Sequence, residues 1–331
     1  MNLLPSEKKR ETLVKSEDTT DESSGKRPED RPLKEYIQKG AINLDKPAGP
    51  TSHEVTSWVK KILEVEKAGH SGTLDPNVTG LLPIMLGDAT KSVDALLTAG
   101  KEYVCLMKLH TEMPEKEIKR VIREFTGEIY QKPSIKSAVK RETRIRTIYY
   151  LELIEVDGKN ILLKVGCEAG TYIRKLCHDM GMALGTGAHM QELRRTKSGP
   201  FREDETLVTL HDLKDAFIEW KENNSEKSLR RVIHPMEFGI SHLPKIVIRD
   251  NAVDAICHGA ELAAPGVLTV ESGIEREDPV AIFTLKGEAV SFGIAKQRTM
   301  EILKAATGIV ATTERVFMEP GTYAKGWKAK G

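Results

Sequence analysis

The feature that most constrains the fold is a change in the pattern of apolar, Gly and Pro residues at His242-Leu243-Pro244. Before this point, strand-like runs alternate with helical segments whose apolar residues fall on one face. After it, short apolar runs follow one another between frequent Gly and Pro turns, from Lys245–Ile248 to Arg315–Phe317. Short strands at such spacing predict a small β-barrel or sandwich of about 80 residues. At 331 residues the chain can hold this unit and a larger domain before it.

The N-terminal segment differs from both regions, because it is polar and charged and shows no apolar periodicity. Such a segment cannot offset its ordering entropy by burial, so we expect it to be flexible unless another surface holds it. We therefore predict a charged tail, a large domain, a small domain and a short C-terminal tail, at residues 1–36, 37–240, 243–322 and 323–331.

The larger domain mixes helices and strands. Thr51 and Glu54 form a capping box that opens a helix to about Leu63. Asp157-Gly158 is a strong hairpin signal between two strands. The predicted strands are 41–44, 103–110, 149–156 and 160–167, and the other predicted helices are 113–125 and one that begins near Thr171.

Composition excludes several classes of protein. No apolar run reaches the roughly 18 residues that cross a bilayer, and the N-terminus does not have the pattern of a signal peptide. The cysteines include no C-x-x-C pair, which argues against a structural zinc site and a secreted disulfide framework. We expect a cytoplasmic protein without membrane association.

Net charge is +1, but positive charge is clustered locally. Residues 131–147 contain six Lys and Arg against one Glu, and residues 190–202 contain four against one. Clusters of this kind can neutralise phosphates of a nucleic acid. Two solvated surfaces explain them equally well.

The segment GHSGTLDPNVTG is the most informative in the chain. Asp75 precedes Pro76, which biases its backbone towards an extended conformation, and the flanking glycines allow tight turns. The loop can therefore present one carboxylate at a fixed place. An aspartate before a proline is also a common helix start, and this simpler interpretation stays open at this point.

A second segment, GTYIRKL, places Tyr172 and Arg174 in the first turn of a helix. An arginine is always charged and can bind a carboxylate in two places, so Arg174 can keep Asp75 ionised and aimed. Tyr103 and His70 are each either ordinary structural residues or groups that contact a base. Arg194-Arg195 is more typical of a solvated face than of a site.

Five blocks in the chain resemble the TruB/dyskerin family of pseudouridine synthases. They occur in the family's order within residues 40–240, and they are INLDKPAGPTSHEVTSWVKKIL, KAGHSGTLDPNVTGLLPIMLGDATK, GKEYV, VGCEAGTYIRKLCHDMGMALGTGAHMQELRRTKSGPF and EDETLVTLHDL. Residues 243–322 resemble the PUA domain, a small RNA-binding barrel. The resemblance implies an α+β fold: a mixed, mostly antiparallel sheet with flanking helices, plus a small C-terminal β-barrel.

The resemblance also implies roles for individual residues. Asp75 matches the catalytic aspartate, Tyr103 the tyrosine that stacks on the target base and takes part in proton transfer, and Arg174 the arginine paired with the aspartate. The residues that match substrate-binding positions are Tyr172, Leu193 and His70.

Residues for RNA binding outside the pocket are less sharply indicated. The basic stretch suggests Lys136, Lys140 and Arg141, in a loop that closes on substrate RNA. The small domain has eight Lys and Arg against eleven Asp and Glu, so shape and hydrogen bonds must contribute more than bulk charge if it binds RNA. The residues that match its RNA groove or lie near it are Lys245, Arg249, His258 and Gly259.

The chain is most similar in pattern to the archaeal dyskerin-like branch, the catalytic subunit of box H/ACA guide ribonucleoproteins. That branch implies a guide RNA, a ribosomal or transfer RNA substrate, and three protein partners: a small Nop-type protein, a Gar-type protein and a kink-turn-binding ribosomal-type protein. Pseudouridine formation has no redox or phosphoryl-transfer step, so we expect no cofactor and no metal. A stand-alone transfer-RNA synthase of the TruB kind and a non-catalytic RNA-binding scaffold are the alternatives.

Overall fold

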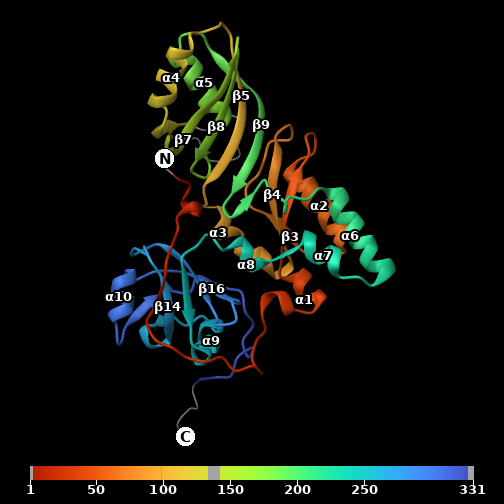
Figure 1. The fold of residues 1–331 in the computed structure, drawn as a ribbon, viewed down its shortest axis with the longest axis vertical. Coiled ribbons are helices and arrows are strands. Elements are labelled where there is room, and N and C mark those ends of the chain that lie inside the picture. The colour runs from red at the N-terminus through yellow and green to blue at the C-terminus, as the bar shows by residue number, and fades with distance from the viewer. Residues whose placement is uncertain (1–2, 98, 133–141, 327–331) are drawn as a thin grey trace.

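One long sheet runs through the larger domain of the computed structural model, which describes residues 3–97, 99–132 and 142–326. Figure 1 shows this sheet extending through the upper and right-hand parts of the molecule. It has ten strands, and along it lie β11 (His234–Pro235), β2 (Gly40–Lys46), β4 (Thr79–Leu86), β9 (Ala188–Ser198), β5 (Lys101–Leu109), β8 (Asn160–Cys167), β7 (Arg144–Asp157) and β6 (Gly127–Gln131). The short strands β3 (Ala68–His70) and β10 (Phe201–Arg202) pair with β4 and β9.

The sheet is mixed and mostly antiparallel, which confirms the expected fold class. Its one described parallel pair joins β4 to β9, near the centre of the strand order. Asp157 and Asn160 close the predicted hairpin, but β7 is longer than predicted and starts at Arg144.

Helices cover the two halves of this sheet separately. In the upper lobe of Figure 1, α4 (Glu115–Glu124) and α5 (Ile173–Ala183) pack over the strands that include β5, β7 and β8, around one apolar core. In the other half, α2 (Ser52–Leu63), α6 (Leu210–Asn223) and α7 (Lys227–Val232) pack over β2 and β4. Thr51 accepts from the backbone of Glu54 and the Glu54 carboxylate accepts from Thr51, so α2 begins with the predicted capping box.

The small domain is built around a six-stranded sheet with its own core. In strand order these are β1 (Thr12–Val14), β14 (Val267–Glu271), β12 (Lys245–Ile248), β15 (Pro279–Phe283), β16 (Ala289–Ile294) and β18 (Arg315–Val316). A further pair, β13 (Leu262–Ala263) and β17 (Ile309–Ala311), and the helices α9 (Asp250–Cys257) and α10 (Thr299–Lys304) complete it. Five of these strands, β12, β14, β15, β16 and β18, lie where strands were predicted, whereas β1, β13, β17 and both helices were not predicted.

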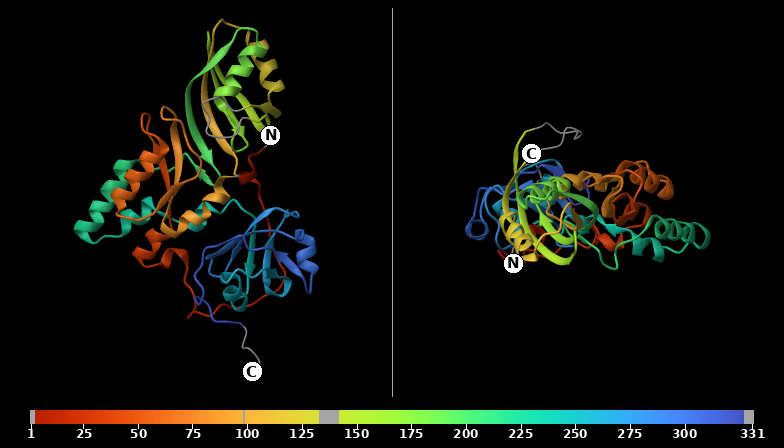
Figure 2. Two further views of the ribbon diagram at one scale, coloured as in Figure 1. Left: turned by 180° about the vertical axis from the view of Figure 1, so that it is seen from behind. Right: turned by 90° about the horizontal axis from the view of Figure 1, so that it is seen from above.

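The described part of the N-terminal segment, residues 3–39, lies on other surfaces and is called the strap here. Both views in Figures 1 and 2 show it running along the small domain before it reaches α1 (Leu33–Gln38). Thr12–Val14 pairs with β14 as the edge strand of the small sheet. The strap also buries apolar side chains, among them Leu4 and Tyr36. Other surfaces therefore hold it, which is the condition under which we did not expect flexibility.

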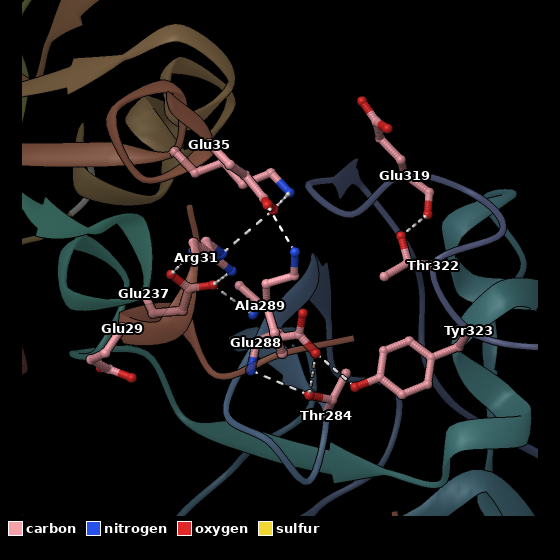
Figure 3. A network of polar contacts seen from close by, with 12 residues as sticks. Glu29, Arg31, Glu35, Glu237, Thr284, Glu288, Ala289, Glu319, Thr322 and Tyr323 are labelled. Atoms are coloured by element: carbon pink, nitrogen blue, oxygen red, sulfur yellow. Dashed lines mark hydrogen bonds and ion pairs between the residues drawn. The ribbon is translucent and has the colours of Figure 1, made fainter. Parts of the chain in front are cut away.

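Arg31 of the strap joins the two domains (Figure 3). Its guanidinium donates two hydrogen bonds, of 2.9 and 2.6 Å, to the Glu237 carboxylate of α8 (Met236–Gly239). Oε1 of Glu237 also accepts from the backbone N–H of Ala289 in the small domain, at 3.0 Å. One buried carboxylate thus holds the strap, the large domain and the small domain together.

Candidate active site

The loop that carries Asp75 lies between β3 and β4 and is fixed from behind. Nζ of the buried Lys46 donates to the carbonyl oxygens of Pro47, Pro76 and Val78, at 2.8 to 2.9 Å. The Ser52 hydroxyl accepts from the backbone N–H of Leu74 at 2.9 Å. A turn closed by a hydrogen bond from Val78 N–H to the Asp75 carbonyl follows, rather than a helix. The loop therefore presents the Asp75 side chain, which is 54% exposed.

Asp75 pairs with Arg174, as predicted. Arg174 lies in the first turn of α5, where Nη2 donates to Oδ2 of Asp75. This single described contact differs from the two-point contact that we expected. Both side chains are more than half exposed, so the ion pair faces solvent and is open to a substrate.

Tyr103 lies close to this pair. It is half-buried near the start of β5, opposite Arg195 of β9 in the strand register. Burial raises the pKa of the Tyr103 hydroxyl and the Asp75 carboxylate raises it further, whereas the Arg195 guanidinium opposes this change. The structure thus brings Asp75, Tyr103 and Arg174 together, from three separate parts of the sequence.

Arg195 corrects the expectation that Arg194-Arg195 forms a solvated face. Arg194 is partly exposed and pairs with Asp45 and Glu203, whereas only 1% of Arg195 is exposed. Neighbouring side chains of a strand point to opposite faces, so the pair divides between surface and interior. The alternation was visible in the sequence, but which of the two arginines faces inward depends on the strand register.

Tyr172 is the N-cap residue of α5, and its backbone is held by one side chain. The amide of Gln131, which is 2% exposed, accepts from the Tyr172 N–H at 2.9 Å and donates to the Tyr172 carbonyl at 3.1 Å. Leu193 is half-buried on β9, opposite Cys105, and packs against the core under α5. Both predicted pocket residues therefore lie on the elements that carry Arg174 and Arg195.

His70 ends β3 just before the Asp75 loop and is half-buried. Burial lowers the pKa of its imidazole to about 4, with smaller contributions from His53 and Arg195. Its ring meets the ring of His53 edge to face, with centroids 5.0 Å apart. His70 is therefore neutral near pH 7 and can contact a base.

The RNA-binding residues predicted in the basic stretch, Lys136, Lys140 and Arg141, lie outside the described residues. In the small domain, Arg249 lines a groove of about 920 Å³ together with Lys15 and Asn251. Arg249 also donates to Asp18 and Ser16 of the strap, at 2.5 and 2.9 Å. The other predicted residues of this domain, Lys245, His258 and Gly259, do not line that groove.

Residues 3–97, 99–132 and 142–326 contain no group of three or more His, Cys, Asp or Glu side chains placed to hold a metal ion. Within the same ranges, no helix has the length and apolar character that spanning a bilayer requires.

Four family models match consecutive parts of the sequence. The TruB family pseudouridylate synthase N-terminal domain matches residues 60–173, and the tRNA pseudouridylate synthase B C-terminal domain matches residues 174–241. The DKCLD domain matches residues 2–56, and the PUA domain matches residues 244–317.

Relatives match over nearly the full length. A probable tRNA pseudouridine synthase B of Methanosarcina barkeri is 62% identical over 327 residues, which cover 99% of this chain and 96% of that protein. The corresponding protein of Pyrococcus horikoshii is 56% identical over 326 residues, 98% of both chains.

Solved structures agree with these relatives. A chain in an H/ACA RNP bound to a substrate RNA containing 2′-deoxyuridine superimposes with a TM-score of 0.92 at 53% identity, over 98% of this chain and 100% of that one. A chain in a Cbf5–Nop10–Gar1 complex gives a TM-score of 0.94 at 55% identity, over 98% and 99%.

Proposed function

This chain belongs to the TruB family of pseudouridine synthases, and we propose that it is the catalytic subunit of a box H/ACA ribonucleoprotein that isomerises selected uridines of ribosomal RNA. Support for the guided reaction comes from the match, over 98% of the chain, to a protein solved in an H/ACA RNP with a substrate RNA. The single observation that carries the site assignment is the pairing of Asp75 with Arg174 beside Tyr103.

We propose that Asp75 is the catalytic carboxylate. The reaction breaks the bond from uridine N1 to the sugar, turns the base and rejoins it through C5. Whether Asp75 adds to the sugar or base or removes a sugar proton, it acts as a carboxylate, and the ion pair with Arg174 holds that carboxylate in place. The exposed position of the ion pair suits a nucleotide that enters from outside a duplex.

Tyr103 is proposed to hold the flipped base. Extracting a uridine from its stack costs a few kcal/mol, and a base–aromatic contact returns about 1–3 kcal/mol. Tyr172, Leu193 and His70 would line the same pocket, on the strength of their positions beside Arg174, Arg195 and the Asp75 loop.

The partners proposed for this chain are a guide RNA, a Nop10-like protein, a Gar1-like protein and a kink-turn-binding protein. Chains that match this one at TM-scores of 0.89 to 0.94 were solved in complexes with Nop10 and Gar1. We propose the groove at Arg249 as the guide-RNA surface of the small domain. Lys136, Lys140 and Arg141 remain proposed RNA contacts on the basis of charge alone.

The remaining sequence predictions are kept as proposals. We propose that residues 37–240 form the catalytic domain and residues 243–322 the RNA-binding domain, with flanking tails at 1–36 and 323–331. We also propose a cytoplasmic location, which the four free, buried cysteine thiols support because disulfides are rare in that compartment.

A second candidate function is the stand-alone modification of transfer RNA. The name that the relatives carry, tRNA pseudouridine synthase B, favours it. Both candidates use the same active site, and they differ in whether a guide is needed.

The deciding experiment measures pseudouridine formation on a ribosomal-RNA target strand, with and without a matching H/ACA guide and the partner proteins, and on transfer RNA. Activity on the target strand only with the guide set supports the guided role. Activity on transfer RNA that gains nothing from the guide would move the protein to the stand-alone role. Absence of activity on every RNA, with correctly folded protein, would refute the proposal.

A further inference from the structure

Arg195 occupies a central place in the sheet. Its strand, β9, lies between β4 and β5, and the register places Arg195 beside Gly80 of β4 and opposite Tyr103 of β5 (Figure 1). A Cβ atom at Gly80 would lie 2.2 Å from the Arg195 carbonyl oxygen, so the glycine allows the two strands to meet this closely. The residue is therefore fixed by backbone on both sides.

The side chain of Arg195 is buried and reaches the loop that carries Asp75. Nε donates to the carbonyl of Leu81 at 2.7 Å, and Nη2 donates to the carbonyl of Gly72 at 3.2 Å. Gly72 has φ +88°, and a Cβ there would lie 3.5 Å from Nη1, so the loop packs directly on the guanidinium. The two carbonyl groups thus hold the guanidinium in a fixed orientation.

The strand register places Tyr103 opposite Arg195, and the guanidinium lowers the pKa of the Tyr103 hydroxyl against the larger effect of burial. Arg194, its neighbour in sequence, is neutralised by two carboxylates, whereas the described hydrogen bonds of the Arg195 side chain go to two uncharged carbonyl groups. A buried cation costs free energy unless nearby groups stabilise it. Its positive potential therefore acts on the tyrosine oxygen, with little screening by solvent.

We propose that Arg195 is a positioning residue for pseudouridine formation, which orients the Tyr103 hydroxyl and stabilises negative charge on its oxygen. This inference rests on the proposed function and extends it to a residue that does not touch the substrate. The hydrogen bonds to the Leu81 and Gly72 carbonyls hold the guanidinium in this position.

The chemistry needs a proton acceptor at this place. After C5 has bonded to C1′, the hydrogen on C5 leaves as a proton and N1 gains a proton, so the isomerisation consumes none overall. The phenolate oxygen of Tyr103 accepts the C5 proton and becomes a hydroxyl again, and solvent supplies the proton at N1. A neighbouring cation favours the phenolate and thus the proton transfer.

The test uses single-turnover pseudouridine formation by the complete guide complex between pH 5.5 and 9, with Arg195→Gln, Arg195→Lys, Tyr103→Phe and the Arg195→Gln/Tyr103→Phe double variant. We expect Arg195→Gln to be roughly tenfold slower at pH 7 and to need about one unit higher pH for the same rate, because the pKa of Tyr103 rises without the cation. Arg195→Lys keeps the charge and should restore most of the pH dependence. The matched control is Arg194→Gln, which should keep the wild-type pH profile.

The double variant separates this role from ordinary structural support. If Arg195 acts through the Tyr103 hydroxyl, Arg195→Gln should slow the Tyr103→Phe enzyme by less than about twofold. An equal loss in both backgrounds, or an unchanged pH profile, would overturn the inference.

Folding is checked separately. If Arg195→Gln does not fold, the ionisation of Tyr103 is followed by tyrosinate absorbance in wild type and in Arg195→Lys. In each case the signal of the matching protein with Tyr103→Phe is subtracted. A titration that matches wild type while the rate profile differs would equally overturn the inference. A wild-type complex that makes no pseudouridine would instead refute the proposed function, so the two failures are distinguishable.

Discussion

The Gln131 side chain hydrogen-bonds to both backbone groups of Tyr172: its carbonyl oxygen accepts from the N–H, and its amide nitrogen donates to the C=O. Gln131 ends β6 at the edge of the sheet, whereas Tyr172 caps the helix that carries Arg174. A buried amide thus fixes the start of α5 from a strand 41 residues earlier in the chain.

Replacing Gln131 should therefore impair catalysis more than RNA binding. Gln131→Leu keeps the size but removes the acceptor of the Tyr172 N–H, whereas the Tyr172 carbonyl still accepts from the N–H of Leu176. Leaving the N–H unpaired costs about 1–3 kcal/mol. We expect at least a tenfold slower single-turnover rate with RNA affinity within about threefold of wild type. Glu128→Ala, an exposed change on the same strand, is the control and should have the wild-type rate. A wild-type rate for Gln131→Leu would contradict this role.

Asp75→Asn should bind RNA normally but lose turnover. The amide cannot act as a base or nucleophile, so we expect a loss of roughly a thousandfold or more, about 4 kcal/mol in barrier. Residual activity within roughly tenfold of wild type would contradict the assignment of Asp75 as the catalytic carboxylate. Gel-shift affinity for the substrate RNA, measured beside the rate, shows whether the site is still formed.

Arg174→Lys tests whether the ion pair needs a guanidinium. A lysine keeps the charge, but its ammonium is a compact point charge on a flexible stem and cannot present a planar fork of donors to Asp75. We expect roughly a hundredfold slower turnover, about 2.7 kcal/mol in barrier, with little change in RNA affinity. A lysine variant within about threefold of wild type would show that charge alone suffices.

The sequence predicted the residues proposed for the chemistry better than the residues that hold them in position. Asp75, Tyr103 and Arg174 lie in short motifs whose resemblance to a family identifies them, and the structure brings them together. Arg195 was placed on a solvated face, because the strand register that decides which arginine faces inward involves partners far away in sequence. Gln131 carries no motif at all, and its role follows only from the contact with Tyr172.

The strap shows the same limit for the fold. Residues 12–14 have no apolar pattern that would predict a strand, and they pair with Val267–Glu271 through backbone hydrogen bonds. Local propensity does not encode an edge strand that a distant sheet induces. Five strands of the small domain, in contrast, were predicted because their apolar runs are local, whereas the short pair β13 and β17 was not.

Lys46→Met should weaken both the fold and the reaction. The methionine fills the space but cannot donate to the three carbonyl oxygens that Nζ now serves, two of which follow Asp75 in the loop. We expect the free energy of unfolding to fall by about 3 kcal/mol and the single-turnover rate to fall at least tenfold. Urea titration and the rate assay measure the two effects. Lys61→Met, an exposed change on α2, is the control, and equal behaviour of the two variants would argue against the role of Lys46.

His242 makes stability depend on pH at the junction of the two domains. The residue is 8% exposed, and its Nε2 lies 3.2 Å from the carbonyl of Ala95. Burial, with help from the nearby Lys101 and Arg10 cations, lowers the pKa of its imidazole to about 4, although the hydrogen bond to the Ala95 carbonyl opposes this change. The unfolded chain therefore binds a proton at this histidine below about pH 6.5, whereas the folded protein does not until about pH 4.

The free energy of unfolding should consequently fall as the pH is lowered from 6.5 towards 4, by about 1.4 kcal/mol for each pH unit from this one group. His242→Gln removes the titration, so its stability should fall less than that of wild type between pH 6.5 and 5, a range above the pKa of most carboxylates. Urea unfolding at both pH values gives the two slopes. His211→Gln, which changes an exposed side chain in the first turn of α6, serves as the control. Equal slopes for wild type and His242→Gln would mean that His242 is already protonated in the folded protein, or is not buried there.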